Sequence, residues 1–333
     1  MTKQQLKSSL KDTKGYFHKN KLKKGYKWLS NRYNVTESLV RQAVSELREE
    51  YYNNLDVKID DSDLLDSLET KEYSFNSSNS ITRDGTYLVL GCVHAPFQNK
   101  AMIDSVFKFI DSEIKIAGII LNGDIIDNHS LSRYNRGKVT IPGINLQWEY
   151  DQANKFMDQV DSLLRSSGEV NPQKHYLFGN HERTYFKAIS EFDASKYGEA
   201  LKSPSEALKL DQRGYRVQSV YEEAYLMLGH NLEVNHGEFY NVHCAKKTID
   251  VYKHSVLFNH THRFQIYSEG KTVGWNMGWA GDVNSPAFNY ASRSMKNSWV
   301  NACALVTLDA YSDHYVQPLI FKNDKLIVNN KIY

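Results

Sequence analysis

The sequence predicts a mixed α/β fold preceded by a small all-α module. After residue 81, short apolar runs alternate with helix-like stretches, and further apolar runs then follow one another closely. The helical module is predicted by the apolar spacing of residues 28–47, which repeats at intervals of three and four. A chain of 333 residues suits one large domain together with one small module.

The composition is that of a folded protein that works in a reducing compartment. Hydrophobic residues make up 41% of the chain and aromatic residues 12%, which excludes a disordered chain. The three cysteines are too few and too scattered for a disulfide framework. The sequence shows no apolar stretch of signal-peptide or membrane-spanning length. We therefore expect a cytoplasmic protein without membrane contacts, located in the host cytoplasm if a phage encodes it.

Charge divides the chain into segments. Residues 1–50 carry twelve basic and five acidic side chains, whereas residues 51–80 carry two basic and seven acidic side chains. A basic head followed by an acidic stretch rich in Ser and Asn is typical of a module joined to a domain by a linker. We therefore predict a helical module at 1–52, a linker at 53–80 and the main domain at 81–333. The alternative is an ordinary solvated surface.

The helical module shows the pattern of two helices around a turn. Leu29 and Tyr33 share a face of the first helix, and Val40, Val44 and Leu47 share a face of the second. The pattern resembles the helix-turn-helix of bacterial and phage DNA-binding proteins, whose second helix enters the major groove. The alternative is a helical hairpin used for dimerisation or for docking on the main domain. The residues expected to contact DNA are Thr36, which is also a good N-cap, and Glu37, Ser38, Arg41 and Gln42.

The main domain is predicted from its apolar runs and from the helix-like stretches between them. The expected helices are 101–113 and 147–166. The expected strands are 86–91, 117–124, 175–180, 224–229, 232–237, 255–260 and 304–309.

Five of these strands lead into clusters of residues that can bind metals. In α/β sheets, ligands bind at the carboxyl ends of strands, where loops converge. A single His at a strand end is usually structural, but five such clusters are difficult to explain by packing. Carboxylate, amide and imidazole groups suit borderline divalent ions such as Mn, Fe, Zn or Ni. The clusters contain Cys92 and His94; Asp124 and Asp127; Asn180, His181 and Glu182; His236; and His260 and His262.

The order of these clusters resembles the signature of the calcineurin-like metallophosphoesterase superfamily, namely DxH, GDxxD, GNH(E/D), HG and GHxH. The resemblance spans about residues 86–310 and looks most like bacteriophage and bacterial members. It implies a four-layer α/β/β/α sandwich, two divalent metal ions and hydrolysis of phosphate esters by a metal-bound hydroxide. The superfamily includes protein phosphatases, cyclic-nucleotide phosphodiesterases and a nuclease.

The resemblance also implies a role for each residue. Asp124 would bridge the two metal ions. His181 would face the substrate and protonate the leaving oxygen, and Asp127 would hydrogen-bond His181 and fix its tautomer. Arg183, directly after the GNHE motif, is a candidate for binding phosphate. The remaining ligands would be His94 and His262, with position 92, for the first ion, and Asn180, His236 and His260 for the second.

Two residues depart from the family pattern. Cys92 stands where the family has its first Asp. It is either a ligand that favours a softer metal or the cause of a weakened or empty first site, and an artificial substitution is a further explanation. Asn259 stands where the family has Gly before its GHxH histidines, and we expect it to change the local turn only.

Three functions agree with these features. The first is an enzyme acting on nucleic acid, either a DNA nuclease or a polynucleotide phosphatase. The second is a phosphatase or phosphodiesterase of small molecules or proteins, with the helical module serving assembly. The third is a DNA-binding protein whose hydrolase site is impaired by Cys92.

Overall fold

The structure is a computed structural model in which the chain forms two compact units, residues 1–74 and 75–333. Most of the predicted linker, namely residues 57–78, lies outside the part that the structure describes. None of the described helices combines the length and the apolar character needed to cross a membrane. The described residues are 2–12, 17–18, 21–22, 26–56, 79–132, 141, 143–191 and 202–333.

The N-terminal unit is built on three helices, α1 (Lys3–Asp12), α2 (Tyr26–Tyr33) and α3 (Glu37–Asp56). Between α2 and α3, Asn34 has a φ of 52°, a left-handed conformation that Asn tolerates better than most residues. Thr36 Oγ1 accepts a hydrogen bond from the Leu39 amide at 3.3 Å and so caps α3. The buried core of the unit consists of Leu6, Leu10, Leu29, Val40, Ala43, Val44 and Leu47.

The N-terminal unit also contains one short strand pair, which the sequence did not indicate. Two short strands, β1 (Phe17–His18) and β2 (Lys21–Leu22), pair antiparallel with Phe17 opposite Leu22. So short a ribbon leaves no periodic signal in the sequence.

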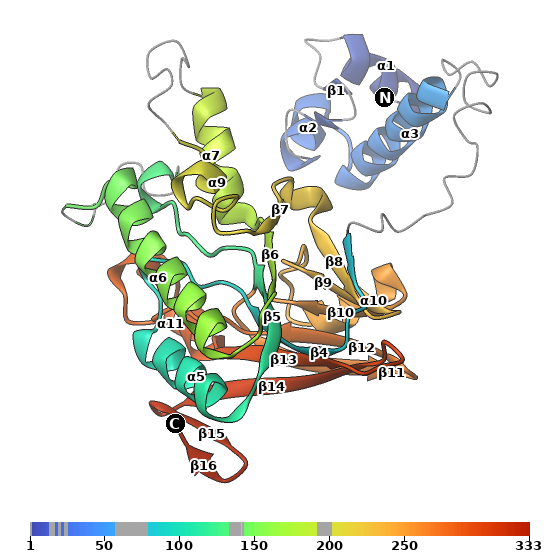
Figure 1. The fold of residues 1–333 in the computed structure, drawn as a ribbon. Coiled ribbons are helices and arrows are strands. Elements are labelled where there is room, and N and C mark those ends of the chain that lie inside the picture. Colours follow the sequence, from blue (N-terminus) through green and yellow to red (C-terminus); the bar gives the residue numbers. More distant parts are fainter. Residues whose placement is uncertain are drawn as a thin grey trace. The chain divides into compact units, whose positions relative to one another are not determined.

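The second unit contains two mixed sheets (Figure 1). The first has the strand order β16-β15-β14-β13-β4-β5-β6-β7, and the second β11-β12-β10-β9-β8-β3. The strands of the first sheet are β4 (Gly85–Leu90), β5 (Ile116–Asn122), β6 (Gln173–Leu177), β7 (Arg216–Gln218), β13 (Ala302–Leu308), β14 (His314–Lys322), β15 (Lys325–Val328) and β16 (Lys331–Ile332). Those of the second are β3 (Ser80–Ile81), β8 (Tyr225–Leu228), β9 (Leu232–Asn235), β10 (Ser255–Phe258), β11 (Phe264–Glu269) and β12 (Thr272–Met277).

The alternation of side chains along β4 shows how the layers pack. Tyr87 and Val89 belong to the core between the two sheets, whereas Leu88 and Leu90 belong to the core beneath α5 (Lys100–Glu113) and α6 (Leu146–Ser166). On the other side, α10 (Cys244–Tyr252) packs against the six-stranded sheet. Figure 1 shows α5 and α6 beside the eight-stranded sheet and α10 beside the six-stranded one. The predicted α/β/β/α sandwich is therefore confirmed.

Parallel pairing brings the carboxyl ends of five strands together. β4, β5 and β6 are parallel neighbours in one sheet, and β9 and β10 are parallel neighbours in the other. The loops that follow these strands carry the five predicted clusters, and α7 (Asn180–Glu191) begins at the third of them. The remaining short helical segments are η2 (His129–Leu131), α9 (Pro204–Ala207), η5 (Tyr221–Glu223), η6 (Pro286–Phe288) and α11 (Arg293–Ser298).

A buried carboxylate on α7 ties two of these loops together. Glu182 is fully buried, and its Oε2 accepts hydrogen bonds from the amides of Gly179 at 2.8 Å and Asp124 at 2.9 Å. Its Oε1 accepts from the Ile125 amide at 2.8 Å and from the Tyr176 hydroxyl at 2.9 Å. A single side chain therefore holds the loop after β5 against the loop after β6.

We expect Glu182→Gln to destabilise the protein by roughly 2–5 kcal/mol, because buried N–H donors lose a charged acceptor and face an NH2 group. The measurement is denaturant unfolding in a chelating buffer, which separates folding from metal binding. Glu113→Gln is the control, since Glu113 makes an exposed ion pair with Lys331, and solvent-exposed pairs contribute little to stability. Equal stability of the two variants would contradict this role of Glu182.

Candidate metal centre

The structure brings the predicted ligand atoms together at the ends of the five strands. His94 Nε2 lies 3.1 Å from His262 Nε2 and 4.0 Å from Asp124 Oδ2. His236 Nε2 lies 3.1 Å from Asp124 Oδ2 and 3.2 Å from Asn180 Oδ1. Asp124 therefore lies between two groups of donor atoms, which come from both sheets.

Hydrogen bonds fix which nitrogen of each imidazole faces this centre. His236 Nδ1 lies 2.9 Å from the carbonyl oxygen of Asn122, which only accepts, so Nδ1 carries the hydrogen in the neutral ring. Its Nε2 then directs a lone pair at Asp124 Oδ2 and Asn180 Oδ1, which are acceptors as well. Lone pairs that converge in this way need a cation or a proton between them. The residues present therefore fit a metal ion.

His94 is oriented by Asp127 in the same manner. Its Nδ1 lies 2.9 Å from Asp127 Oδ2. Burial raises the pKa of Asp127, but His181, His129 and His94 lower it by more, so that this pKa lies below its ordinary value and the carboxylate is ionised. His94 consequently donates through Nδ1 and presents the lone pair of Nε2. A carboxylate that orients a histidine is the usual arrangement behind metal-ligating imidazoles.

His260 and His262 have the protonation state that metal binding requires. Burial lowers the pKa of His260 to about 4, with a further decrease from His236. Burial and then His94 hold the pKa of His262 well below its usual value. Both rings are therefore neutral near pH 7. The buried Nδ1 of His260 has no hydrogen-bond partner among the described residues, which leaves it available to a ligand.

Backbone strain is concentrated at the same place. A left-handed backbone is uncommon for residues other than Gly and typically persists where the surrounding structure enforces it, often at functional sites. Of the seven predicted ligands, five have φ between 50° and 60°, namely Cys92, His94, Asp124, His260 and His262.

His181 lies at the first turn of α7, beside the donor atoms. Its amide donates to Asp124 Oδ1 at 2.8 Å, and its ring lies 4.6 Å from the ring of His94. His181 Nδ1 lies 2.6 Å from the main-chain oxygen of Asp127 and 3.5 Å from the carboxylate. The carbonyl of Asp127 is thus the nearer partner of His181, while its carboxylate serves His94. Burial lowers the pKa of His181, but Asp124 and Asp127 together raise it to about 9.

Arg183 lies two residues after His181 on α7 and is held by the segment at η5. Its guanidinium forms an ion pair with Glu222 and lies 4.9 Å from the centre of the Tyr221 ring. Tyr221 donates its hydroxyl to the carbonyl of Gly237 at 2.8 Å, and its ring is 5.9 Å from that of His236. Arg183 is therefore connected to the Asn180, His236 and His260 group through Tyr221.

Asn259 does more than shape its own turn, which corrects our expectation. Its side chain is buried, with Oδ1 accepting from Asn122 Nδ2 at 2.9 Å and Nδ2 donating to the Gly278 carbonyl at 3.1 Å. Asn259 therefore ties the end of β10 to the ends of β5 and β12. A buried amide can satisfy partners on both sides, which a glycine cannot.

One further residue that supports the site, Glu149, had no role in the sequence-based prediction. Glu149 on α6 is buried and accepts the amides of His129 at 2.6 Å and Ser130 at 2.8 Å. This holds His129 Nδ1 at 3.5 Å from Asp127 Oδ1. The sequence gives little indication of this role for Glu149, because a buried acidic residue on an amphipathic helix looks the same in sequence as an exposed acidic residue.

The predicted DNA-contacting residues lie on one helix of the N-terminal unit. Ser38, Arg41 and Gln42 are exposed on α3, and Thr36 serves as its cap. Glu37 pairs with Arg41 at 3.6 Å, one turn along the helix. This exposed face is opposite the residues that α3 buries against α1 and α2.

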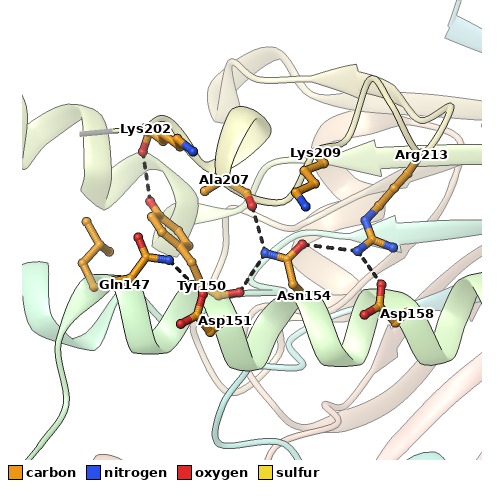
Figure 2. Close-up of a pocket in the computed structure, with 10 residues that line it drawn as sticks. Gln147, Tyr150, Asp151, Asn154, Asp158, Lys202, Ala207, Lys209 and Arg213 are labelled. Atoms are coloured by element: carbon orange, nitrogen blue, oxygen red, sulfur yellow. Dashed lines mark hydrogen bonds and ion pairs between the residues drawn. The ribbon is translucent and has the colours of Figure 1, made fainter. Parts of the chain in front are cut away.

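A hollow of about 510 Å³ lies along α6, away from the predicted metal ligands, and is shown in Figure 2. Its Arg213 is paired with Asp158 at 2.6 Å and also with Asp161, so its charge is already compensated. None of the predicted site residues is among the described residues that line it. The lining residues include Gln147, Tyr150, Asp151, Asn154, Lys202 and Lys209.

Comparisons with known proteins agree with this geometry. The family model for calcineurin-like phosphoesterases matches residues 85–308. No curated protein matches the chain. Among solved structures, Vps29 from Cryptosporidium parvum is 11% identical with a TM-score of 0.37, covering 75% of this chain and 96% of its own. Zinc-complexed Vps29 from Entamoeba histolytica is 13% identical with a TM-score of 0.35, covering 74% and 96%.

A predicted phosphoesterase from Streptococcus pneumoniae is 12% identical with a TM-score of 0.30, covering 75% of this chain and 97% of its own. These structural similarities are remote and carry no argument about activity. The family model, in contrast, spans more than half of the chain and includes every strand-end cluster described above. The chain belongs to the calcineurin-like phosphoesterase family, whose members are hydrolases of phosphate esters that use divalent metal ions.

Proposed function

We propose that this protein hydrolyses phosphate esters of DNA at a centre of two divalent metal ions. The observation that carries the metal centre is the convergence of lone pairs from His94, His236, Asn180 and Asp124, fixed by hydrogen bonds to the opposite side of each imidazole. In a cluster of histidines that only supported the fold, the side chains would instead donate N–H groups to one another's acceptor atoms. The proposal for DNA is supported separately, by the N-terminal unit.

Asp124 would hold both ions, since its Oδ2 lies near His94 on one side and His236 on the other. His262 would complete the first position, and Asn180 and His260 the second. Two bound divalent ions lower the pKa of a water molecule and neutralise charge on the phosphate during an in-line displacement.

The residues of the chain would perform the remaining steps. His181 is anchored through Nδ1, so that its Nε2 is available to give a proton to the leaving oxygen. Asp127 would keep His181 and His94 oriented. Arg183 would bind a phosphate oxygen through its guanidinium, next to the second metal position.

DNA as the substrate is supported by the exposed face of α3. The arrangement of α2, a short turn and α3 resembles a helix-turn-helix, with an apolar core on one side and Ser38, Arg41 and Gln42 on the other. In such a module the second helix would read the major groove. The excess of basic residues in the first fifty positions would supply contacts to phosphates.

We expect His181→Ala to lower kcat by about 10² or more while the metal content stays unchanged, because a general acid contributes in this range and His181 is not a ligand. Asp124→Ala should instead lose bound metal together with activity. The measurements are elemental analysis and turnover of nitrophenyl phosphate mono- and diesters. The exposed His230, whose ring contacts the Tyr311 carbonyl, supplies the control His230→Ala, which should be unaffected. Full activity of metal-free protein would refute the proposal.

We expect the double substitution Arg41→Ala with Gln42→Ala to weaken DNA binding roughly tenfold or more, because both side chains would contact bases or phosphates. Hydrolysis of nitrophenyl esters should not change. The measurement is fluorescence anisotropy with duplex DNA at a stated salt concentration, and Lys322→Ala, which removes an exposed charge from β14, is the control.

The alternatives predict different results in the same assays. A phosphatase of small molecules or proteins would leave all forms of DNA intact and turn over a nucleotide or a phosphoprotein. If the N-terminal helices serve assembly, their substitution would alter the oligomeric state rather than DNA affinity.

A further inference from the structure

The chain places a cysteine among the donor atoms of its first metal position. Cys92 directly follows β4 and is fully buried. Its Sγ and the ligand atoms of His94 and His262 all lie within 4.8 Å of one another. A second group with the same spacing joins Cys92 to Asp124 and His236. The sulfur is therefore within reach of an ion at the first position.

A hydrogen bond and the local backbone fix this sulfur beside the donor atoms, at the edge of an apolar cluster. The amide of His260 donates to Cys92 Sγ at 3.2 Å and so ties the sulfur to the loop that carries His260 and His262. The backbone of Cys92 is left-handed with φ 50°, a conformation that filling the adjacent core does not require. The other cysteines, Cys244 and Cys303, are also free and buried.

The geometry of the two imidazoles suits a tetrahedral ion. Two nitrogens bound to zinc at about 2.0–2.1 Å with tetrahedral angles lie roughly 3.3 Å apart. The 3.1 Å between the Nε2 atoms of His94 and His262 is close to that value. One sulfur, two nitrogens and one carboxylate oxygen make a donor set typical of thiophilic divalent ions, whereas manganese and magnesium prefer oxygen.

We infer that Cys92 is a thiolate ligand of the first ion, and that the position formed with His94, His262 and Asp124 selects Zn²⁺ or Fe²⁺ over Mn²⁺ and Mg²⁺. On binding, the sulfur–metal bond forms and the thiol proton passes to solvent. The second position would draw its own ligands, Asn180, His236 and His260, from nitrogen and oxygen donors and is less selective. The two ions are therefore chemically unequal. This inference rests on the proposed dinuclear site.

The test is to reload the metal-free full chain with Co²⁺ and to record its near-ultraviolet absorption. Coordination by a thiolate gives an intense sulfur-to-cobalt charge-transfer band, which nitrogen and oxygen ligands do not. We expect the band in the parent protein and in Cys303→Ala. Cys92→Ser and Cys92→Asp should lack it, and Asp tolerates the left-handed backbone at this position. In competition titrations, Cys92→Asp should shift the ratio of Zn²⁺ to Mn²⁺ affinities about tenfold or more toward Mn²⁺.

The possible outcomes distinguish a failure of this inference from a failure of the proposed function. Bound cobalt without the band, or a band that survives in Cys92→Ser, would overturn the role of Cys92 and leave the hydrolase proposal standing. An unchanged ratio of Zn²⁺ to Mn²⁺ affinities in Cys92→Asp would overturn the selectivity. A chain that binds no cobalt would overturn both proposals.

Discussion

The carboxylate of Asp124 is the point at which the loops of both sheets meet. Oδ1 accepts the amide of His181 at the start of α7, and Oδ2 faces His236 from the other sheet. The amide of Asp124 is held in turn by the buried carboxylate of Glu182. A shift of this residue would disturb the helix start and the donor atoms together. The two sheets must therefore pack in one fixed register for the site to exist.

The strands that position the site could be predicted because both faces of their sheets are covered. All seven residues of β5 are buried, and such a strand appears in the sequence as a continuous apolar run. Strands at or near the sheet edges gave no such signal. β11 is largely exposed, and β14 is interrupted in sequence by Pro318, which lies opposite Ala304. Their pairing depends on neighbouring strands rather than on their own pattern.

The ligands could be predicted from motif order, but the hydrogen bonds that orient them could not. Spacing places Asp127 near His181, yet only the structure shows that the carboxylate turns to His94 and the carbonyl to His181. Likewise, Asn259 differs from the family pattern without any indication that it bridges β5 and β12. These contacts join residues that are between 19 and 137 positions apart, so local sequence carries no information about them.

Backbone strain and the repulsion between buried acceptor groups both make the empty site costly to form. A left-handed backbone at a residue other than glycine costs on the order of 1 kcal/mol or more, and five predicted ligands share this conformation. Converging lone pairs and the buried Asp124 carboxylate add a repulsion that only a cation or a proton relieves. The core between the sheets offsets this cost. Ions that bind the folded chain but not the unfolded chain would then stabilise this strained loop conformation. If Cys92 is a ligand, as we propose, it would decide which ions do so most strongly.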